Sequence, residues 1–328
     1  MSTVFIMPQE PEEAILATAA IEALKGGDNP VFLVCAPKVA PLFYQDSRFA
    51  EVFSLEIKTL FRRWKKTGLF LAEQILRRGP FDAVINLDDT TQSAWLAARI
   101  PAKNRVGYKT PWAPPFIWRK LLKPDPKLHR AAHYGALAAA LEPDTPAGAL
   151  PRLGALGAKS GDRLRIGLMP SGKERSILDW GAHRWAETAL NLSREAEPVL
   201  IGLSGAEFAL ERMDEVLGYN GQDDFERISS RASWQQLRAA IGSLDLAIAT
   251  EGVLMQAALA LGVPTVAIFG PGNPALTGPQ AGQRAKTLYK NQTCSPCKGT
   301  TCAHLHPACL EGIAPSEVLA AAWTLLKP

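Results

Sequence analysis

Short apolar runs alternate with amphipathic helical patterns along the first half of the chain. Residues 3–7, TVFIM, are typical of a buried strand. Residues 12–27 follow with apolar residues at helical spacing and a closing glycine pair. Further strands are predicted for PVFLVCA, FDAVINL and NRVGY, and DDTTQSAWLAARI predicts a helix with Asp and Thr at its start. This alternation predicts a parallel sheet with crossover helices.

The alternation restarts after residues 143–164, which are rich in proline, glycine and alanine and are typical of a linker. Strands are then predicted for RIGLM, PVLIG, DFERI, LDLAIAT and VPTVAIF, with helices between them. We therefore predict an α/β protein with two Rossmann-like domains, residues 1–152 and 153–328, whose parallel sheets face a cleft. The final helix, SEVLAAAWTLL, is a candidate to pack back on the N-terminal domain.

Composition places the chain among soluble globular proteins. Of its 328 residues 47% are hydrophobic and 21% are charged, and no run approaches the roughly 18 to 20 apolar residues of a membrane helix. The N-terminus carries acids and lacks a basic region before its apolar stretch, so we expect no signal peptide. Four of the five cysteines crowd into residues 294–309, which fits a reducing cytoplasm better than a disulfide framework.

The positive charge is concentrated in the N-terminal half. Residues 1–152 hold 20 Lys and Arg against 15 Asp and Glu, whereas the remainder holds 16 against 17. The excess lies in residues 103–130 and in KTLFRRWKK, from which we take four candidate acceptor-binding residues: Arg62, Arg63, Lys65 and Lys66. They predict an anionic partner, such as a phosphorylated glycolipid or an anionic membrane surface. A nucleic acid is not among the partners that we expect. The alternative is a solvated helix face.

Candidate ligand-binding residues follow the predicted strands, because open parallel sheets bind ligands beyond the carboxyl ends of their strands. Glu251 suits a sugar or ribose hydroxyl, and the N–H groups of Gly252, Val253 and Leu254 at the next helix start suit a phosphate. Gly270 and Gly272, after another strand, allow close backbone approach. Further donor-site candidates at strand ends are Ser171, Gly172, Lys173, Arg175 and Glu207.

Two acids, Glu12 and Glu13, open the helix after the first strand. Acids favour this position through the helix dipole alone. A carboxylate that faces a cleft could instead act as a general base on an acceptor hydroxyl. The pattern by itself leaves both interpretations open.

The cysteine segment CSPCKGTTCAHLHPAC is compatible with tetrahedral zinc, although its spacing departs from the usual paired knuckle. The candidate ligands are Cys294, Cys297, Cys302 and Cys309, with His304 and His306 between them. The alternative is four reduced cysteines that pack a loop. The isolated histidines, His129, His133 and His183, are interpreted as surface or satisfied residues.

The order of these pieces resembles glycosyltransferase family 9, the ADP-heptose:lipopolysaccharide heptosyltransferases. The most specific part is LDLAIATEGVLMQAALALGVPTVAIFGPGNPALTGP, which is similar to the family's strand–SGxxH–AAALGxPT–FGP signature. EEAILATAAIEAL, NRVGY, HRAAHYGAL and the cysteine segment with IAPSEV match other blocks of the family. The resemblance spans nearly the whole chain and implies the GT-B arrangement, with the nucleotide sugar on the C-terminal domain and the acceptor on the N-terminal domain.

Several motif positions carry different residues in this chain. Glu13 falls on the family's catalytic aspartate, and Glu251 falls on the aspartate of the signature. Gly252 and Val253 replace a Ser-Gly pair, and Gln256 replaces a histidine. Three further positions complete the comparison: Leu178 replaces a lysine, Lys173 or Arg175 is a candidate to replace that cation, and Glu207 falls on an acid near the base or ribose.

The resemblance implies a metal-independent, inverting transfer of a heptose-like sugar from ADP-heptose or another nucleotide sugar, with no cofactor. The implied acceptor is a lipopolysaccharide-type or other glycan, reached in the cytoplasm or at the cytoplasmic face of the inner membrane. The altered motif positions favour an alternative, a non-catalytic nucleotide- or glycan-binding protein on the same scaffold. An oxidoreductase is disfavoured because no GxGxxG follows a strand.

Overall fold

The structure is a computed structural model that divides into two compact units, residues 1–154 and 155–328. It describes residues 1–24, 29–57, 73–75, 77–112, 118, 120–123, 125–146, 148–157, 161–170, 179–203, 207–219, 225–228, 231–297, 302 and 307–327. Within this part of the chain, no helix combines the length and the apolar character that crossing a membrane requires.

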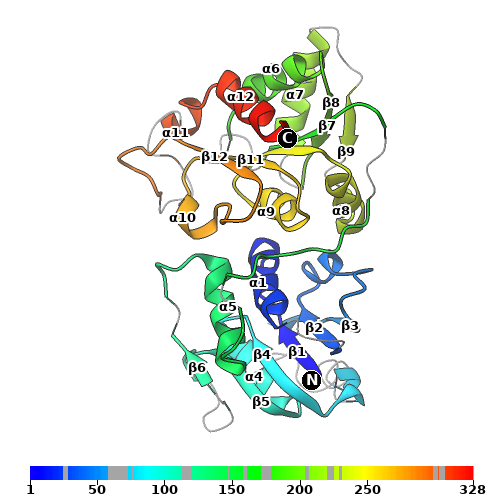
Figure 1. Cartoon of the computed structure of the whole chain (residues 1–328), viewed down its shortest axis with the longest axis vertical. Coiled ribbons are helices and arrows are strands. Elements are labelled where there is room, and N and C mark those ends of the chain that lie inside the picture. The colour runs from blue at the N-terminus through cyan, green and yellow to red at the C-terminus, as the bar shows by residue number, and fades with distance from the viewer. Residues whose placement is uncertain are drawn as a thin grey trace. The chain divides into compact units, whose positions relative to one another are not determined.

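The N-terminal unit is a six-stranded parallel sheet in the order β3-β2-β1-β4-β5-β6, with helices α1, α4 and α5 (Figure 1). Its strands are β1 (Thr3–Ile6), β2 (Val31–Cys35), β3 (Glu51–Ser54), β4 (Phe81–Asn86), β5 (Ala102–Tyr108) and β6 (Lys120–Leu122). Its helices are α1 (Pro11–Ala23), the 3-10 turn η1 (Ala40–Leu42), α4 (Thr91–Arg99) and α5 (Arg130–Leu141).

The C-terminal unit repeats this topology, with a parallel sheet in the order β12-β11-β10-β7-β8-β9 (Figure 1). Its strands are β7 (Arg165–Met169), β8 (Glu197–Ile201), β9 (Glu226–Ile228), β10 (Leu246–Thr250), β11 (Thr265–Phe269) and β12 (Ala285–Tyr289). Its helices are α6 (Ala182–Leu192), α7 (Glu207–Tyr219), α8 (Trp234–Gly242), α9 (Val253–Ala260), α10 (Pro274–Thr277), α11 (Ala308–Glu311) and α12 (Pro315–Leu326).

Both sheets have the doubly wound strand order, so each has a point where the order reverses. In the N-terminal unit β1 and β4 lie side by side at this point, and in the C-terminal unit β7 and β10 do. A ligand of a doubly wound sheet binds outside the carboxyl ends of these two strands. The segments that follow β1, β4, β7 and β10 are therefore where a site is expected.

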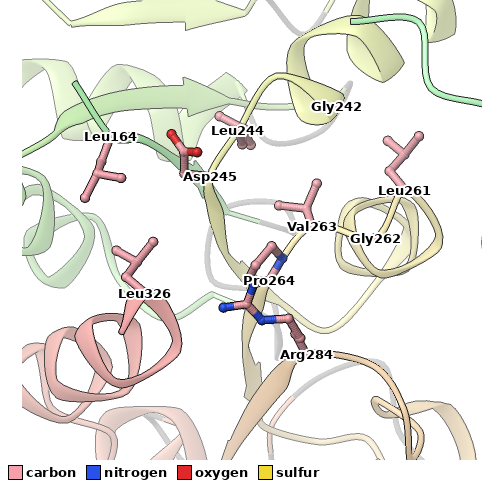
Figure 2. Close-up of a pocket in the computed structure, with 10 residues that line it drawn as sticks. All are labelled: Leu164, Gly242, Leu244, Asp245, Leu261, Gly262, Val263, Pro264, Arg284 and Leu326. Carbon is pink, nitrogen blue, oxygen red and sulfur yellow. The ribbon is translucent and has the colours of Figure 1, made fainter. Parts of the chain in front are cut away.

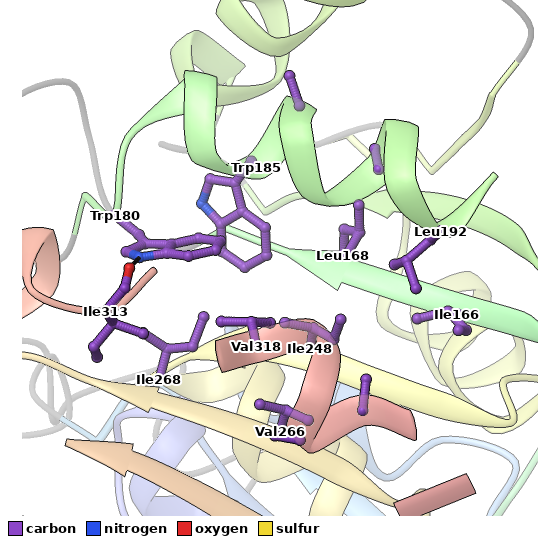
Figure 3. Packing of buried hydrophobic residues seen from close by; sticks show 14 of the residues in the cluster. Ile166, Leu168, Trp180, Trp185, Leu192, Ile248, Val266, Ile268, Ile313 and Val318 are labelled. Atoms are coloured by element: carbon purple, nitrogen blue, oxygen red, sulfur yellow. Dashed lines mark hydrogen bonds between the residues drawn. The ribbon is translucent and has the colours of Figure 1, made fainter. Parts of the chain in front are cut away.

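Buried apolar strands form the centre of each unit. All four residues of β1 and all five residues of β10 are buried, as their uninterrupted apolar runs predict. In the C-terminal core the Trp180 and Trp185 rings meet edge to face at 4.9 Å between centroids, and Trp180 Nε1 donates to the Ile313 carbonyl at 2.9 Å (Figure 3). This bond ties the segment before α6 to the segment before α12.

The final helix belongs to the C-terminal core. Its buried residues Val318, Ala321 and Ala322 join the same cluster as Trp180, and α12 packs on α6 and on strands β10, β11 and β12. The expectation that this helix also packs back on the N-terminal domain stays a prediction.

The end of the N-terminal unit is fixed by a buried ion cluster. Asp46 Oδ2 accepts a hydrogen bond from the Gly154 N–H at 2.9 Å and pairs with Arg48 at 2.6 Å. Arg48 also contacts Glu22 at 2.6 Å and donates to the Arg152 carbonyl at 3.1 Å. These contacts hold residues 152–154 against the N-terminal unit.

Candidate active site

A pocket of about 250 Å³ lies where β1 and β4 end, at the reversal point of the N-terminal sheet. Residues 8–10 and Glu13 reach it from the β1–α1 segment, and residues 87–90 reach it from the segment after β4. The remaining lining residues are Tyr108 at the end of β5 and Arg130, His133 and Tyr134 on α5. We call this the Glu13 pocket.

Glu13 is held at both carboxylate oxygens by residues of α5. Arg130 Nε lies 3.0 Å from Oε1 and 3.2 Å from Oε2, and Arg130 Nη2 lies 3.0 Å from Oε1. The Tyr134 hydroxyl donates to Oε2 at 2.7 Å. A carboxylate offers about four lone-pair sites, so these contacts fix its orientation and leave little room for more than one further donor. The Glu13 side chain keeps 26% of its surface exposed, which leaves it accessible from the pocket.

The sequence of α5 explains why these side chains meet Glu13. Arg130, His133 and Tyr134 are spaced i, i+3 and i+4, so they lie on one face of the helix. That face packs against α1, whose first turn carries Glu13. The N-cap of α5 is His129, whose Nδ1 accepts the Ala131 N–H at 3.2 Å and fixes where the helix begins.

His133 and Tyr108 form a buried stack beside the pocket. Their rings lie 4.4 Å apart at an interplanar angle of 17°, and the Tyr108 hydroxyl donates to the His133 carbonyl at 2.9 Å. Burial, together with the nearby charge of Arg130, lowers the pKa of His133 below its usual value, which favours the neutral imidazole. Burial also raises the pKa of Tyr134, so its hydroxyl stays protonated and can donate to Glu13.

Asp88 joins the two segments that form the pocket mouth. It is 5% exposed, and its Oδ2 accepts hydrogen bonds from Gln9 Nε2 at 2.9 Å and from Thr90 Oγ1 at 2.7 Å. Burial raises the pKa of Asp88 even though these two donors oppose the shift. The contacts tie the β1–α1 segment to the segment after β4, so Asp88 orders the pocket that contains Glu13.

On the C-terminal unit, α9 begins at the predicted position. Gly252 is the N-cap residue with φ of 138°, and the first intrahelical bond runs from the Gln256 N–H to the Gly252 carbonyl. The N–H groups of Val253 and Leu254 precede that bond, so they have no acceptor within the helix. A glycine is needed at 252 because side chains rarely adopt this φ.

Glu251 is engaged by the protein itself. Its Oε1 accepts the backbone N–H groups of Gly270 at 2.9 Å and Gly272 at 3.0 Å, and its Oε2 lies against Gly272 where a Cβ would overlap it. Burial raises the pKa of Glu251, and the two N–H groups oppose that shift. The glycines that we expected to admit a ligand therefore admit the Glu251 carboxylate, and Gly270 also lies close to Leu310.

Gln256 likewise has a partner within the fold. It is 3% exposed, and its Nε2 donates to the Thr277 carbonyl at 2.6 Å. This contact ties α9 to α10. The donor-site role that the signature suggests for Gln256 stays a prediction.

Other expected site residues lie outside the described part of the chain. They are the donor-loop residues Ser171, Gly172, Lys173 and Arg175, the motif position Leu178, and the basic residues Arg62, Arg63, Lys65 and Lys66. Glu207 is the first residue of α7. Their roles remain predictions.

The four clustered cysteines are described, and all are free thiols. Cys297 Sγ donates to the Cys294 carbonyl at 3.4 Å, and the Cys297 N–H donates to the Pro271 carbonyl at 2.8 Å, which anchors this segment to the Gly270–Gly272 turn. The described residues, which include Cys302 and Cys309 but neither His304 nor His306, contain no group of three or more His, Cys, Asp or Glu placed to hold a metal. The zinc site that their spacing allows stays a prediction.

A second cavity, of about 330 Å³, lies in the C-terminal unit at the amino ends of its strands (Figure 2). Leu164, Asp245, Pro264 and Arg284 line it, and each directly precedes a strand. Its charged groups are used internally, because Asp245 accepts the Arg165 N–H at 3.0 Å and Arg284 donates to the Leu325 carbonyl at 2.7 Å. This cavity lies at the amino ends of the strands, away from the edge where such sheets bind ligands.

Most residues of the Glu13 pocket were not predicted from the sequence. Glu13 was identified, but His133 was interpreted as an isolated surface or satisfied residue, and Arg130, Tyr134 and Asp88 were given no role. The i, i+3, i+4 spacing of Arg130, His133 and Tyr134 was a usable signal that one helix face is polar and aromatic. Asp88 also follows a predicted strand, and the rule applied to Glu251 would have included it.

Comparison with known proteins identifies the family. The model described as "Glycosyltransferase family 9 (heptosyltransferase)" matches residues 71–307. A curated relative, Lipooligosaccharide heptosyltransferase 2 of Campylobacter jejuni, is 29% identical over 164 residues, which are 49% of this chain and 51% of the relative. The same enzyme from a second strain of that species is 28% identical over 163 residues. The chain thus spans about half the length of the curated relatives it matches.

Solved structures share the fold over the whole chain. E. coli ADP-heptose lps heptosyltransferase II has a TM-score of 0.79 at 19% identity, covering 99% of this chain and 98% of that one. The family 9 glycosyl transferase from Veillonella parvula has a TM-score of 0.81 at 22% identity, covering 99% and 97%. E. coli heptosyltransferase WaaC with ADP has a TM-score of 0.74 at 14% identity, covering 99% and 100%. These findings confirm the resemblance seen in the sequence: the chain belongs to glycosyltransferase family 9 and has its α/β fold of two Rossmann-like domains in the GT-B arrangement.

Proposed function

We propose that this protein transfers a heptose-like sugar from a nucleoside diphosphate donor to a hydroxyl group of a lipopolysaccharide-type glycan, with Glu13 as the general base. The observation that carries the proposal is the Glu13 carboxylate at the reversal point of the N-terminal sheet, oriented by Arg130 and Tyr134 inside a pocket. Family membership supports the reaction class.

In the proposed reaction the acceptor oxygen attacks the anomeric carbon of the donor sugar. The bond from that carbon to the diphosphate oxygen breaks, the nucleoside diphosphate leaves with the electron pair, and Glu13 takes the proton of the acceptor hydroxyl. Attack from the face opposite the leaving group inverts the anomeric centre. The chain's part is to hold Glu13 rigidly, because a base is effective only within hydrogen-bond reach of its proton.

We place the donor on the C-terminal unit, beyond β7 and β10. The N–H groups at the start of α9 suit the negative charge that develops on the diphosphate, and Ser171, Gly172, Lys173 and Arg175 follow β7 in the sequence. Glu251 then contributes indirectly, by fixing the turn that contains Gly270 and Gly272. The donor that we propose is ADP-heptose, and the transfer requires no metal or other cofactor.

The charges of the Glu13 pocket refine the expected acceptor. Its described charged lining consists of four carboxylates, on Glu10, Glu13, Asp88 and Asp89, and one guanidinium, on Arg130. Carboxylates accept hydrogen bonds from sugar hydroxyls and repel phosphates. We therefore propose that the sugar entering this pocket is uncharged, and that the anionic groups of the acceptor meet the basic residues Arg62, Arg63, Lys65 and Lys66. We place the reaction in the cytoplasm.

A direct test incubates the protein with ADP-heptose and an inner-core oligosaccharide and follows the product by mass spectrometry, with and without EDTA. One added heptose, in equal yield in both samples, is the expected result. A thermal-shift screen with ADP, UDP, GDP and CDP identifies the nucleotide separately, because a ligand that binds only the folded state raises the melting temperature.

The alternative is a nucleotide- or glycan-binding protein without activity. The internal engagement of Glu251 and Gln256 is the observation that favours it. ADP binding without transfer to any inner-core acceptor would support this alternative and would reject the enzymatic proposal.

A further inference from the structure

One tryptophan of the N-terminal unit is presented to solvent by a specific local structure. Trp112 is 87% exposed, and its backbone has φ of 58°, a conformation that non-glycine residues rarely adopt. Trp95 Nε1 donates to the Trp112 carbonyl at 3.1 Å, and Thr91 Oγ1 donates to the Pro111 carbonyl at 2.7 Å. Two side chains of α4 thus hold this backbone in place. The indole is exposed to solvent, although burial of its apolar surface would stabilise the fold.

Positive charge surrounds this tryptophan in the chain. Residues 103–130 contain eight basic residues and one acid, Asp125. Arg105 is used by the carbonyls of residues 97, 100 and 102, Lys103 pairs with Asp82, and Arg130 pairs with Glu13. The exposed lysines of this segment that form no ion pair with any described residue are Lys109, Lys120, Lys123 and Lys127.

The aromatic and basic groups that lie together are carried by α4 and by the segment after β5. Lys109 follows β5, and its N–H donates to the Leu122 carbonyl of the edge strand β6. Lys120 of β6 pairs with Val106, two residues before the Tyr108 that stacks on His133, so Lys120 lies on the α5 face of the sheet instead. The Arg99 guanidinium lies 5.6 Å from the centroid of the Trp95 ring. We call the following residues the Trp112 surface: Trp95, Arg99, Lys109, Pro111 and Trp112.

We propose that the Trp112 surface is a membrane contact, in which the Trp112 indole enters the boundary between headgroups and acyl chains of an anionic bilayer. Tryptophan is enriched at this depth because its ring is apolar and its N–H is polar. Lys109 and Arg99 meet the phosphates of the lipid headgroups, whose negative potential attracts basic segments. The proposal does not depend on which sugar the protein transfers.

Charge argues for a bilayer over a second copy of the chain. A two-fold contact through this surface would place the same residues of both copies against each other. Lys109 and Arg99 of one copy would then face the same residues of the other around the paired tryptophans, and like charges repel. An anionic lipid surface supplies the opposite charge and an apolar layer together.

The test is cosedimentation of the full chain with vesicles of phosphatidylcholine, prepared with and without phosphatidylglycerol. We expect binding only to the anionic vesicles, weakened about ten-fold by Trp112→Ser through the loss of buried aromatic surface. Lys109→Gln weakens it about five-fold, and added salt has the same direction of effect. The matched control is Tyr219→Ser, because Tyr219 is 94% exposed but lies on α7 of the C-terminal unit.

Three results would overturn the proposal. Binding that Trp112→Ser leaves unchanged would reject insertion, and a loss seen only with Lys109→Gln would reduce the contact to headgroup phosphates. Equal binding to both kinds of vesicle, or none, would reject the surface. A dimer in gel filtration that Trp112→Ser converts to a monomer would assign the surface to a second copy. Thermal melting of each variant confirms that it is folded.

Discussion

The Tyr134 hydroxyl donates a hydrogen bond to Glu13 Oε2 at 2.7 Å, joining α5 to the first turn of α1. Since burial raises the pKa of Tyr134, its hydroxyl stays protonated at neutral pH and can donate this bond. We predict that Tyr134→Phe lowers kcat about ten-fold, because a hydrogen bond to a charged group contributes roughly 1.5–3 kcal/mol. Initial rates of sugar transfer measure the effect.

The control for this variant is Tyr219→Phe, which removes a hydroxyl from an exposed residue on α7. It should leave the rate unchanged. If both variants transfer sugar at the wild-type rate, Tyr134 does not position the base.

Arg130 should matter through its shape as well as its charge. It contacts both oxygens of Glu13 through Nε and Nη2. Lysine keeps the charge but cannot form the two-pronged contact, so we expect Arg130→Lys to lower kcat/KM about ten-fold and Arg130→Gln to lower it further. Equal rates for Arg130→Lys and the wild type would show that charge alone suffices.

The Asp46 cluster predicts an acid-dependent loss of stability. The carboxyl is 2% exposed, and burial acts to raise its pKa, but hydrogen bonds and charge from Arg48 outweigh burial and lower it below its usual value. A lowered pKa gives stability that is fully present above the unfolded value, near pH 4, and is lost as the pH falls through the folded value. We predict that Asp46→Asn lowers the free energy of unfolding by about 3 kcal/mol at neutral pH.

Urea unfolding of Asp46→Asn and the wild type across pH checks this. The difference between them should shrink as the pH falls below about 4, since protonation removes the charge of Asp46 from the wild type as well. A difference that is constant down to acid pH would contradict the assignment.

Gly272 and Glu251 should be coupled sterically. A Cβ at position 272 would overlap Glu251 Oε2, so Gly272→Ala must displace the carboxylate or the turn. We expect it to lower the free energy of unfolding by about 1–3 kcal/mol. In a Glu251→Asp background the shorter carboxylate lies farther from position 272. Gly272→Ala should then lower the free energy of unfolding by less. A double-mutant cycle measures this coupling, and strictly additive effects would contradict it.

The central strands of both sheets were predictable, and three edge strands were not. Fully buried strands such as β1 and β10 read as continuous apolar runs, whereas β3, β6 and β12 lie at sheet edges and carry polar residues, as in EVFS, KLL and AKTLY. An edge strand is covered on fewer sides, so its sequence carries a weaker apolar signal.

For the site, the strand-end rule located Glu13 and Glu251, but it could not determine what each carboxylate contacts. Glu13 meets residues of α5 that are 117 and 121 positions away, and Glu251 meets backbone N–H groups of a later turn. Such pairings depend on the packing of α1 on α5 and of the β11 turn on β10. No local sequence pattern encodes these pairings, and the expected contact of Glu251 with a ligand hydroxyl stays a prediction.

The most direct test of Glu13 as the general base compares Glu13→Gln with the wild type in two assays. One assay measures transfer from ADP-heptose, and the other measures ADP binding by calorimetry. Glutamine keeps the shape and can accept hydrogen bonds, but it cannot take the acceptor proton. We predict that the rate of transfer falls about 100-fold or more while ADP affinity stays the same, because general-base catalysis typically contributes about 10²- to 10⁴-fold to the rate. A Glu13→Gln protein that transfers sugar at the wild-type rate would contradict the assignment of Glu13 as the general base.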